Sequence, residues 1–184
     1  FKVKAKTPVK KEPEWDYELA KQLIRGKKIV FCLPGRGVSY VYLKNFVQLC
    51  FDIVQAGGGI QISQDYSSMV NFARCKCLGA NVLRGPNQLP WDGKLEYDWQ
   101  LWIDSDIVFN TDKFWQLILN STPKEAITYQ DVIQPLKDEK GQVIKDEKGN
   151  DRTTVVGQQL VVDKSKQRPI VSGWYCTEDG RTTS

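Results

Sequence analysis

Histidine is absent from this sequence of 184 residues. The chain therefore lacks the commonest general base of enzymes, and it cannot form the Ser–His or Cys–His pairs that activate a nucleophile. It also lacks imidazole ligands, so a bound metal ion would be held by oxygen atoms. Oxygen ligands indicate magnesium, manganese or calcium.

Long apolar runs are also absent, since the longest extends over only a few residues near 29–33. We therefore expect no integral membrane segment and no signal peptide. Cysteine occurs five times, and this odd number favours reduced thiols over a disulfide framework. Reduced thiols predict a cytoplasmic localisation.

The net charge is only +4, and much of it lies at the start of the chain, where lysines precede any acidic residue. We expect residues 1–13 to form a disordered basic arm that stays in solvent. The aromatic residues lie in apolar patterns and are not interleaved with basic residues on one face. We therefore predict no nucleic-acid partner.

Strand-like and helix-like segments alternate over the first 120 residues. Helices are predicted at 14–25, 38–57, 67–81 and 110–120, and strands at 29–33, 59–66 and 97–109. In the second helix the apolar positions are Val41, Phe46, Leu49 and Ile53, and in the third Ser67 is the expected cap. The alternation predicts an α/β fold with a Rossmann-like, mainly parallel sheet flanked by helices.

Residues 123–168 are polar and contain the repeat KDEKG at 137–141 and 145–149. Two copies of a charged turn ending in glycine predict a protruding, polar β-hairpin insertion. A buried-strand pattern returns at Ile170 and Val171, soon before the last residue. We expect residues 14–184 to form a single domain that contains this insertion and is truncated at its C-terminus.

The segment LWIDSDIVF (101–109) places Asp104 and Asp106 two residues apart within an apolar strand pattern. In a strand both side chains would point to the same side, at the carboxyl edge where parallel sheets bind ligands. Two carboxylates so close repel each other unless a positive charge lies between them. We therefore predict that Asp104 and Asp106 bind Mn²⁺ or Mg²⁺, with coordination positions left for a diphosphate. The alternative is a strand end with two solvated carboxylates.

The segment YDWQLWIDSDIVF (97–109) resembles the Asp-x-Asp strand of nucleotide-diphospho-sugar glycosyltransferases with the GT-A fold. The similarity is to family-2-like enzymes of the type encoded by phages, large viruses and environmental sequences. The order of segments is also similar: LPGR with Ser39 after the first strand, then DYSSMVNFARCKCLG, WIDSDIVF and IVSGWYCTEDGRTT. The resemblance covers residues 27–120 and 169–184.

This resemblance implies a metal-dependent transfer of a sugar from a nucleotide-diphosphate sugar to a glycan, lipid or protein acceptor. It implies a GT-A-like nucleotide-sugar-binding domain in which Asp106 ligates the metal and acts in catalysis, with Asp104 on the metal or ribose. The other residues that it implies for donor binding are Pro34, Gly35, Arg36, Ser39, Asp65 and Arg74. An inverting enzyme also needs a carboxylate base, for which Glu178 and Asp179 are the candidates.

Two other functions remain open. A haloacid-dehalogenase-like phosphatase also has an apolar strand followed by Asp-x-Asp, in which Asp104 would be the nucleophile and Asp106 the acid–base. A non-catalytic module would bind the same nucleotide sugar without transferring it.

Overall fold

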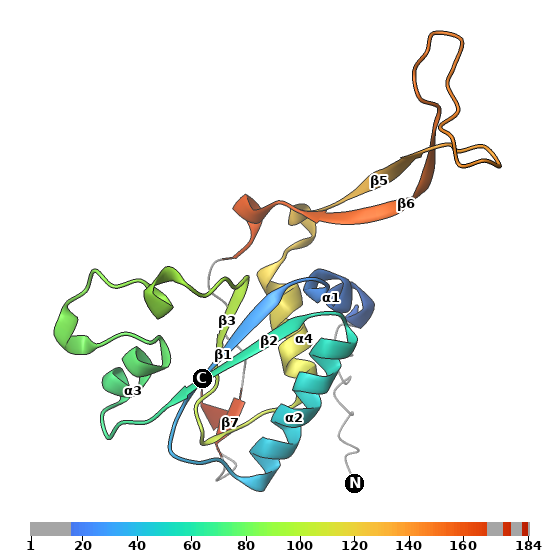
Figure 1. Ribbon diagram of the computed structural model, residues 1–184. Coiled ribbons are helices and arrows are strands. Elements are labelled where there is room, and N and C mark those ends of the chain that lie inside the picture. The colour runs from blue at the N-terminus through green and yellow to red at the C-terminus, as the bar shows by residue number, and fades with distance from the viewer. Residues whose placement is uncertain (1–15, 169–174, 178–181, 184) are drawn as a thin grey trace, which may run out of the picture.

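Strand β1 (Lys28–Pro34) is the middle strand of a three-stranded parallel sheet with the order β2-β1-β3. It pairs with β2 (Gly59–Asp65) along its whole length and with β3 (Trp99–Trp102) on its other side. The computed structural model describes residues 16–168, 175–177 and 182–183 (Figure 1). The predicted mixed α/β class with a parallel sheet is confirmed at this level.

Helices cover both faces of β1, which explains its continuous apolar run. On one face Phe31 packs against Phe46 of α2 (Tyr40–Gln55) and Phe114 of α4 (Thr111–Ser121). Helix α1 (Tyr17–Ile24) packs beside α4 on the same face. The alternate residues of β1 face α3 (Val70–Cys77), which lies on the other side of the sheet (Figure 1).

Helix α2 buries Tyr42, and not Val41, against the sheet. Its buried residues are Tyr42, Phe46, Leu49 and Ile53, whereas Val41 is exposed. Positions 42, 46, 49 and 53 repeat at the spacing of one helical face, and position 41 lies about 100° away from position 42. Val41, which the sequence grouped with Phe46, Leu49 and Ile53 by its spacing, therefore lies outside the buried face.

The starts of the helices depend on local capping, and one of the predicted caps is wrong. Asp16 and Asn110 accept backbone N–H bonds at the starts of α1 and α4, as expected for N-caps. Helix α3 begins later than predicted, because Met69 is its N-cap and has no side-chain cap bond. Ser67 instead accepts the N–H of Met69 within the preceding loop.

The predicted third strand at 97–109 is divided into two. Strand β3 ends at Trp102, and residues 103–106 form a turn before β4 (Ile107–Val108). Strand β4 belongs to a second sheet, where it pairs antiparallel with β7 (Tyr175–Thr177), which pairs with β8 (Thr182–Thr183). The apolar residues on both sides of the aspartates have the sequence pattern of one continuous strand, but they belong to two different sheets.

The insertion forms an antiparallel hairpin, as predicted, built from β5 (Ile127–Pro135) and β6 (Thr153–Val162). It projects away from the parallel sheet and ends in two loops (Figure 1). In the loops Asp138 and Asp146 accept backbone N–H bonds two and four residues ahead, so the sequence repeat is a repeated turn. The hairpin is less polar than expected, since Tyr129 and Ile133 are exposed.

Four short 3₁₀ turns complete the described structure: Val82–Arg84 (η1), Pro90–Gly93 (η2), Lys124–Ala126 (η3) and Lys164–Lys166 (η4). Across the described residues, no helix combines the length and the apolar character needed to cross a membrane. The predicted basic arm at 1–13 and the predicted strand residues Ile170 and Val171 lie outside the described residues.

We expect the protein to lose stability in alkali because of Cys32 in the central strand β1. Burial, with a smaller contribution from Cys77, raises the pKa of the Cys32 thiol from 9.0 to about 12. Between these values the unfolded chain releases the Cys32 proton and the folded chain keeps it. The free energy of unfolding should therefore fall as the pH rises, by up to about 1.4 kcal/mol per pH unit from this group.

Urea denaturation at about pH 8 and about pH 10.5 measures this effect. Other groups also titrate in this range, so the comparison is with Cys32→Ala, whose stability should fall less steeply with pH. Equal pH dependence in the two proteins would contradict the prediction.

Candidate functional site

The three parallel strands end at one edge of the sheet, and the loops that follow them lie together there. Gly35 and Arg36 follow β1, Tyr66 follows β2, and the turn at 103–106 follows β3. Because the strands are parallel, their carboxyl ends must meet at this edge, which is where open α/β sheets commonly bind ligands. The structure therefore brings together most of the residues that the sequence indicated.

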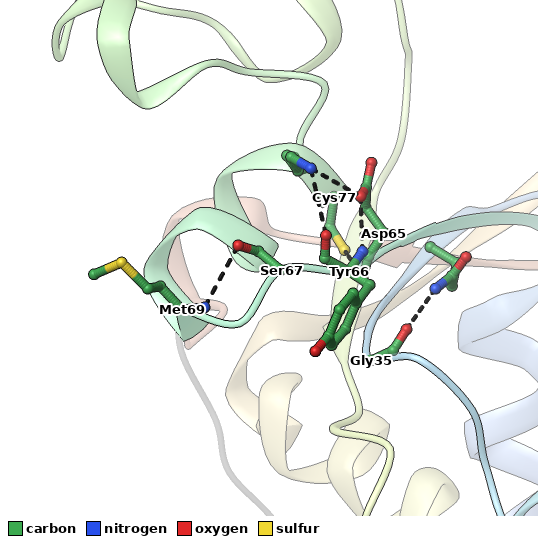
Figure 2. Close-up of polar contacts among 8 residues, drawn as sticks. Gly35, Asp65, Tyr66, Ser67, Met69 and Cys77 are labelled. Atoms are coloured by element: carbon green, nitrogen blue, oxygen red, sulfur yellow. Dashed lines mark hydrogen bonds and ion pairs between the residues drawn. The ribbon is translucent and has the colours of Figure 1, made fainter.

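Gly35 joins the three loops. Its N–H donates to the carbonyl oxygen of Asp65 at 3.0 Å. Its own carbonyl oxygen accepts from the Gln64 side chain, and Figure 2 draws this bond at Gly35. On its other side, a Cβ built on Gly35 would lie 2.5 Å from the Cβ and Oγ of Ser105. Only glycine allows the β1 loop to approach the Asp104–Asp106 turn so closely.

Asp65 ends β2, as predicted, but it does not cap helix α3. Its carboxylate accepts the N–H of Tyr66 at 2.7 Å and lies 3.7 Å from the Lys76 ammonium. Its carbonyl also faces the thiol of Cys77 (Figure 2). These contacts fix the end of β2 against α3, and the partly exposed carboxylate remains accessible to a ligand.

Arg74 projects from α3 toward the turn after β3. Its Nη2 lies 3.2 Å from Oδ2 of Asp104, and its guanidinium carbon lies 5.9 Å from the centre of the Trp102 ring. Both partners of the ion pair are about half exposed. The side chains can therefore separate at little cost and turn toward a charged ligand.

Asp104 and Asp106 occupy a turn that is closed by the N–H of Ile107 donating to the carbonyl of Asp104 at 3.1 Å. The expectation that they face the same side of a strand is therefore wrong, because β3 has ended before them. Asp106 is exposed, and no ion pair joins it to another described residue. Both carboxylates remain at the carboxyl edge, where a ligand can reach them.

The chemistry of this donor set fits a divalent cation only in part. Carboxylate oxygens are the ligands that Mg²⁺ and Mn²⁺ prefer. Within residues 16–168 and the short described strands beyond them, no three potential ligand residues gather to surround an ion. The two aspartates suit a cation that takes its remaining ligands from water and from phosphate oxygens.

Arg36 lies over an aromatic ring at the same edge. Its guanidinium carbon is 4.5 Å from the centre of the Tyr66 ring, a distance typical of cation–π contacts. Sequence reasoning identified Arg36 but missed Tyr66, Gln64, Trp102 and Ser105. Only contacts across strands reveal these residues, and nothing in their local patterns marks them.

Tyr42 lies beneath the turn, in the buried face of α2. Its hydroxyl is 3.5 Å from the carbonyl oxygen of Ile103. Burial, then the charge of Asp104 and then Cys50, raise the pKa of Tyr42 well above its ordinary value. The phenol therefore stays protonated and supports the backbone next to Asp104.

Two residues that the resemblance assigned to the donor have structural contacts. Ser39 is the N-cap of α2, where its Oγ accepts the N–H of Tyr42. Pro34 is buried at the end of β1, opposite Asp65. The candidate bases Glu178 and Asp179 lie outside the described residues.

A pocket of about 300 Å³ opens beside these loops on the α2 side of the sheet. Its lining includes Gly35, Arg36 and Ser105, together with Tyr42 and Ile62. A larger pocket of about 570 Å³ lies between α1, α2 and α4. None of the predicted site residues lines the larger pocket, so the smaller one is the candidate ligand pocket.

Comparisons with protein families, with curated proteins and with solved structures found no match to this chain.

The contact between Gly35 and Ser105 predicts a specific steric effect. Gly35→Ala should lower the free energy of unfolding by about 1–3 kcal/mol, because the new methyl group overlaps Ser105 and the backbone has a φ of +155°. Adding Ser105→Gly should recover part of this loss. Urea denaturation of the single and double variants measures both effects.

Gly37→Ala is the matched control, because a Cβ at Gly37 meets nothing within 4 Å. It should change stability by less than about 0.5 kcal/mol. If Gly35→Ala costs no more than Gly37→Ala, the close approach of the two loops is not as described.

Proposed function

We propose that this chain is a metal-dependent glycosyltransferase of the GT-A type, which binds a nucleotide-diphosphate sugar at the carboxyl edge of its parallel sheet. The proposal combines the resemblance of the sequence segments with the positions of the residues that they contain. The sugar acceptor would be a glycan, a lipid or a protein.

The observation that carries the proposal is the convergence of three loops that are far apart in the sequence. Gly35 contacts Ser105 and bonds to Asp65, while Arg74 reaches Asp104 from the helix between them. The sequence order of these residues suggested one donor site, and the parallel order of β2, β1 and β3 brings the loops that carry them to one edge. Arginines and carboxylates together suit a ligand that carries phosphates and a divalent cation.

A cation held by Asp104 and Asp106 would act as a Lewis acid toward the leaving diphosphate. The arginines have a related role, because they can stabilise the negative charge that develops on the same group. Arg74 pairs with Asp104, and its half-exposed guanidinium can turn toward a phosphate. Arg36 lies over Tyr66 at the other side of the β1 loop, near the candidate pocket.

The pocket next to Gly35 is large enough to hold part of a ligand. Its volume of about 300 Å³ lies at the lower end of the range for small-molecule sites. Arg36 and Ser105 supply polar groups, and the rest of the lining is mainly apolar. This combination suits a ligand with a charged end and a flat or apolar end.

Nucleotide binding tests the proposal directly. Isothermal titration with UDP and with GDP should show binding to one of them that requires Mn²⁺. The double variant Asp104→Asn/Asp106→Asn should weaken this binding at least tenfold, or about 1.4 kcal/mol, because it removes both carboxylates from the cation.

Glu96→Gln is the control for the loss of an exposed carboxylate, since Glu96 pairs with Lys28 at the start of β1, away from the loops. It should bind as the wild type does. Metal-dependent binding that the double variant retains would contradict the proposed site, and so would no binding of either nucleotide to the folded chain.

The same protein preparation separates the two alternatives. A phosphatase that uses Asp104 as its nucleophile should be trapped by beryllium fluoride, which mimics an aspartyl phosphate, and a glycosyltransferase should not. A non-catalytic module should bind the nucleotide sugar without hydrolysing or transferring the sugar.

A further inference from the structure

The outer edge of β2 has no partner strand in the part of the chain that the structure describes. The bonds of Gly59 to Lys27 and of Asp65 to Gly35 show that the odd-numbered residues of β2 point their backbone groups toward β1. By alternation, the backbone groups of Ile60, Ile62 and Gln64 point outward. An open edge of this length can pair with another strand.

The open edge lacks the features that usually prevent such pairing. From Gly59 to Gln64 the strand has no charged residue and no proline. Native proteins usually protect an exposed edge with lysine, proline or a bulge. The β2 edge is therefore suited to contact with another strand.

Helix α2 carries a stripe of exposed apolar residues next to this edge. Leu43 lines the pocket together with Ile62 of β2, whereas Asp52 and Gln55 on the opposite flank line the pocket with α1 and α4. The stripe therefore borders the β2 edge at Leu43. We call this surface the apolar shelf; it consists of Tyr40, Leu43, Val47, Phe51, Val54 and Ile62, all exposed.

The helical residues of the apolar shelf have the same spacing in both directions along α2. The steps along Tyr40, Leu43, Val47, Phe51 and Val54 are three, four, four and three residues. When two copies of α2 pack antiparallel about a two-fold axis at Val47, Tyr40 faces Val54 and Leu43 faces Phe51 of the other copy. Lys44 then lies opposite Cys50, so the lysines do not face each other.

Two copies of strand β2 can also pair antiparallel about a two-fold axis, in this case at Ile62. In an antiparallel pair centred there, Ile62 lies opposite Ile62 of the other copy, and Ile60 lies opposite Gln64. Asp65 then lies opposite Gly59, which keeps the two carboxylates at opposite ends of the pair. Phe46, the neighbour of Val47, packs on Phe31, which pairs with Ile62. Val47 and Ile62 therefore lie at a similar level, and one two-fold axis can serve both the strand and the helix.

We propose that the apolar shelf and the β2 edge bind a second copy of this chain in a two-fold symmetric dimer. The two parallel sheets join through antiparallel β2 strands into one continuous sheet, and the two α2 helices pack across the seam. Such an interface is isologous, because the same surface serves both copies. This inference does not depend on the proposed enzymatic function.

Analytical ultracentrifugation of the whole chain at increasing concentration tests the dimer. We expect a dissociation constant of about 10 μM or tighter, within the range that interfaces of standard size span. A chain that stays monomeric at about 100 μM would contradict the proposal and leave the shelf to another segment or another protein.

Substitutions on the axis test the register. Ile62→Lys and Val47→Lys should each weaken the dimer at least tenfold, because each places two lysines opposite each other. Leu83→Lys is the control, since Leu83 is an exposed leucine in η1, outside the shelf. It should leave the dimer unchanged, and an equal loss in this control would contradict the proposal.

A charge pair separates a lost contact from a misfolded chain. Ile62→Lys and Ile62→Glu should each be monomeric alone, and an equal mixture should form a heterodimer, because the two residues face each other only in the proposed register. A mixture that stays monomeric, while both variants are folded by circular dichroism, would overturn this register.

Discussion

The burial of β1 on both faces is the constraint on which the rest of the structure depends. Its residues from Ile29 to Cys32 are almost completely inaccessible to solvent. A strand can be buried in this way only if other strands satisfy both of its edges and helices cover both of its faces. Parallel pairing with β2 and β3 meets the first requirement and brings three strand ends to one edge.

The close approach of Gly35 to Ser105 then decides how these strand ends meet. Since glycine has no side chain, the β1 loop reaches the turn after β3 without a gap. Strand β3 ends at Trp102, and the turn carries Asp104 and Asp106 past this contact before the chain enters the second sheet. The carboxylates thus depend on a turn that is packed against a neighbouring loop, and a longer β3 would have placed them elsewhere.

Apolar surface in this chain is distributed unevenly, and this suggests where contacts with other molecules lie. One flank of α2 covers the sheet, and another side exposes Val47 and Phe51 near a strand edge that no other described strand pairs with. The hairpin also exposes apolar residues, such as Tyr129 and Ile133, at a distance from the sheet. Charged residues lie instead near the loops at the carboxyl edge, where we propose that the nucleotide-diphosphate sugar binds.

The sequence alone determined the elements whose signals are local. The apolar run of β1, the 3.6-residue period of α2, the caps Asp16 and Asn110 and the repeated turns of the hairpin are each formed by neighbouring residues. It also removed imidazole from the possible metal ligands, because the chain has no histidine. It indicated Gly35, Arg36, Asp65, Arg74, Asp104 and Asp106 as candidate site residues before any contact was known.

Only the tertiary structure decided where one strand became two, and which side chains meet. A strand pattern through residues 97–109 has the same local signal whether one sheet or two sheets take it up, so the break after Trp102 was invisible. The pairing of Arg74 with Asp104 and the contact of Gly35 with Ser105 join residues about thirty and seventy positions apart. Such contacts arise from the packing of separate elements, which no periodicity within a single segment records.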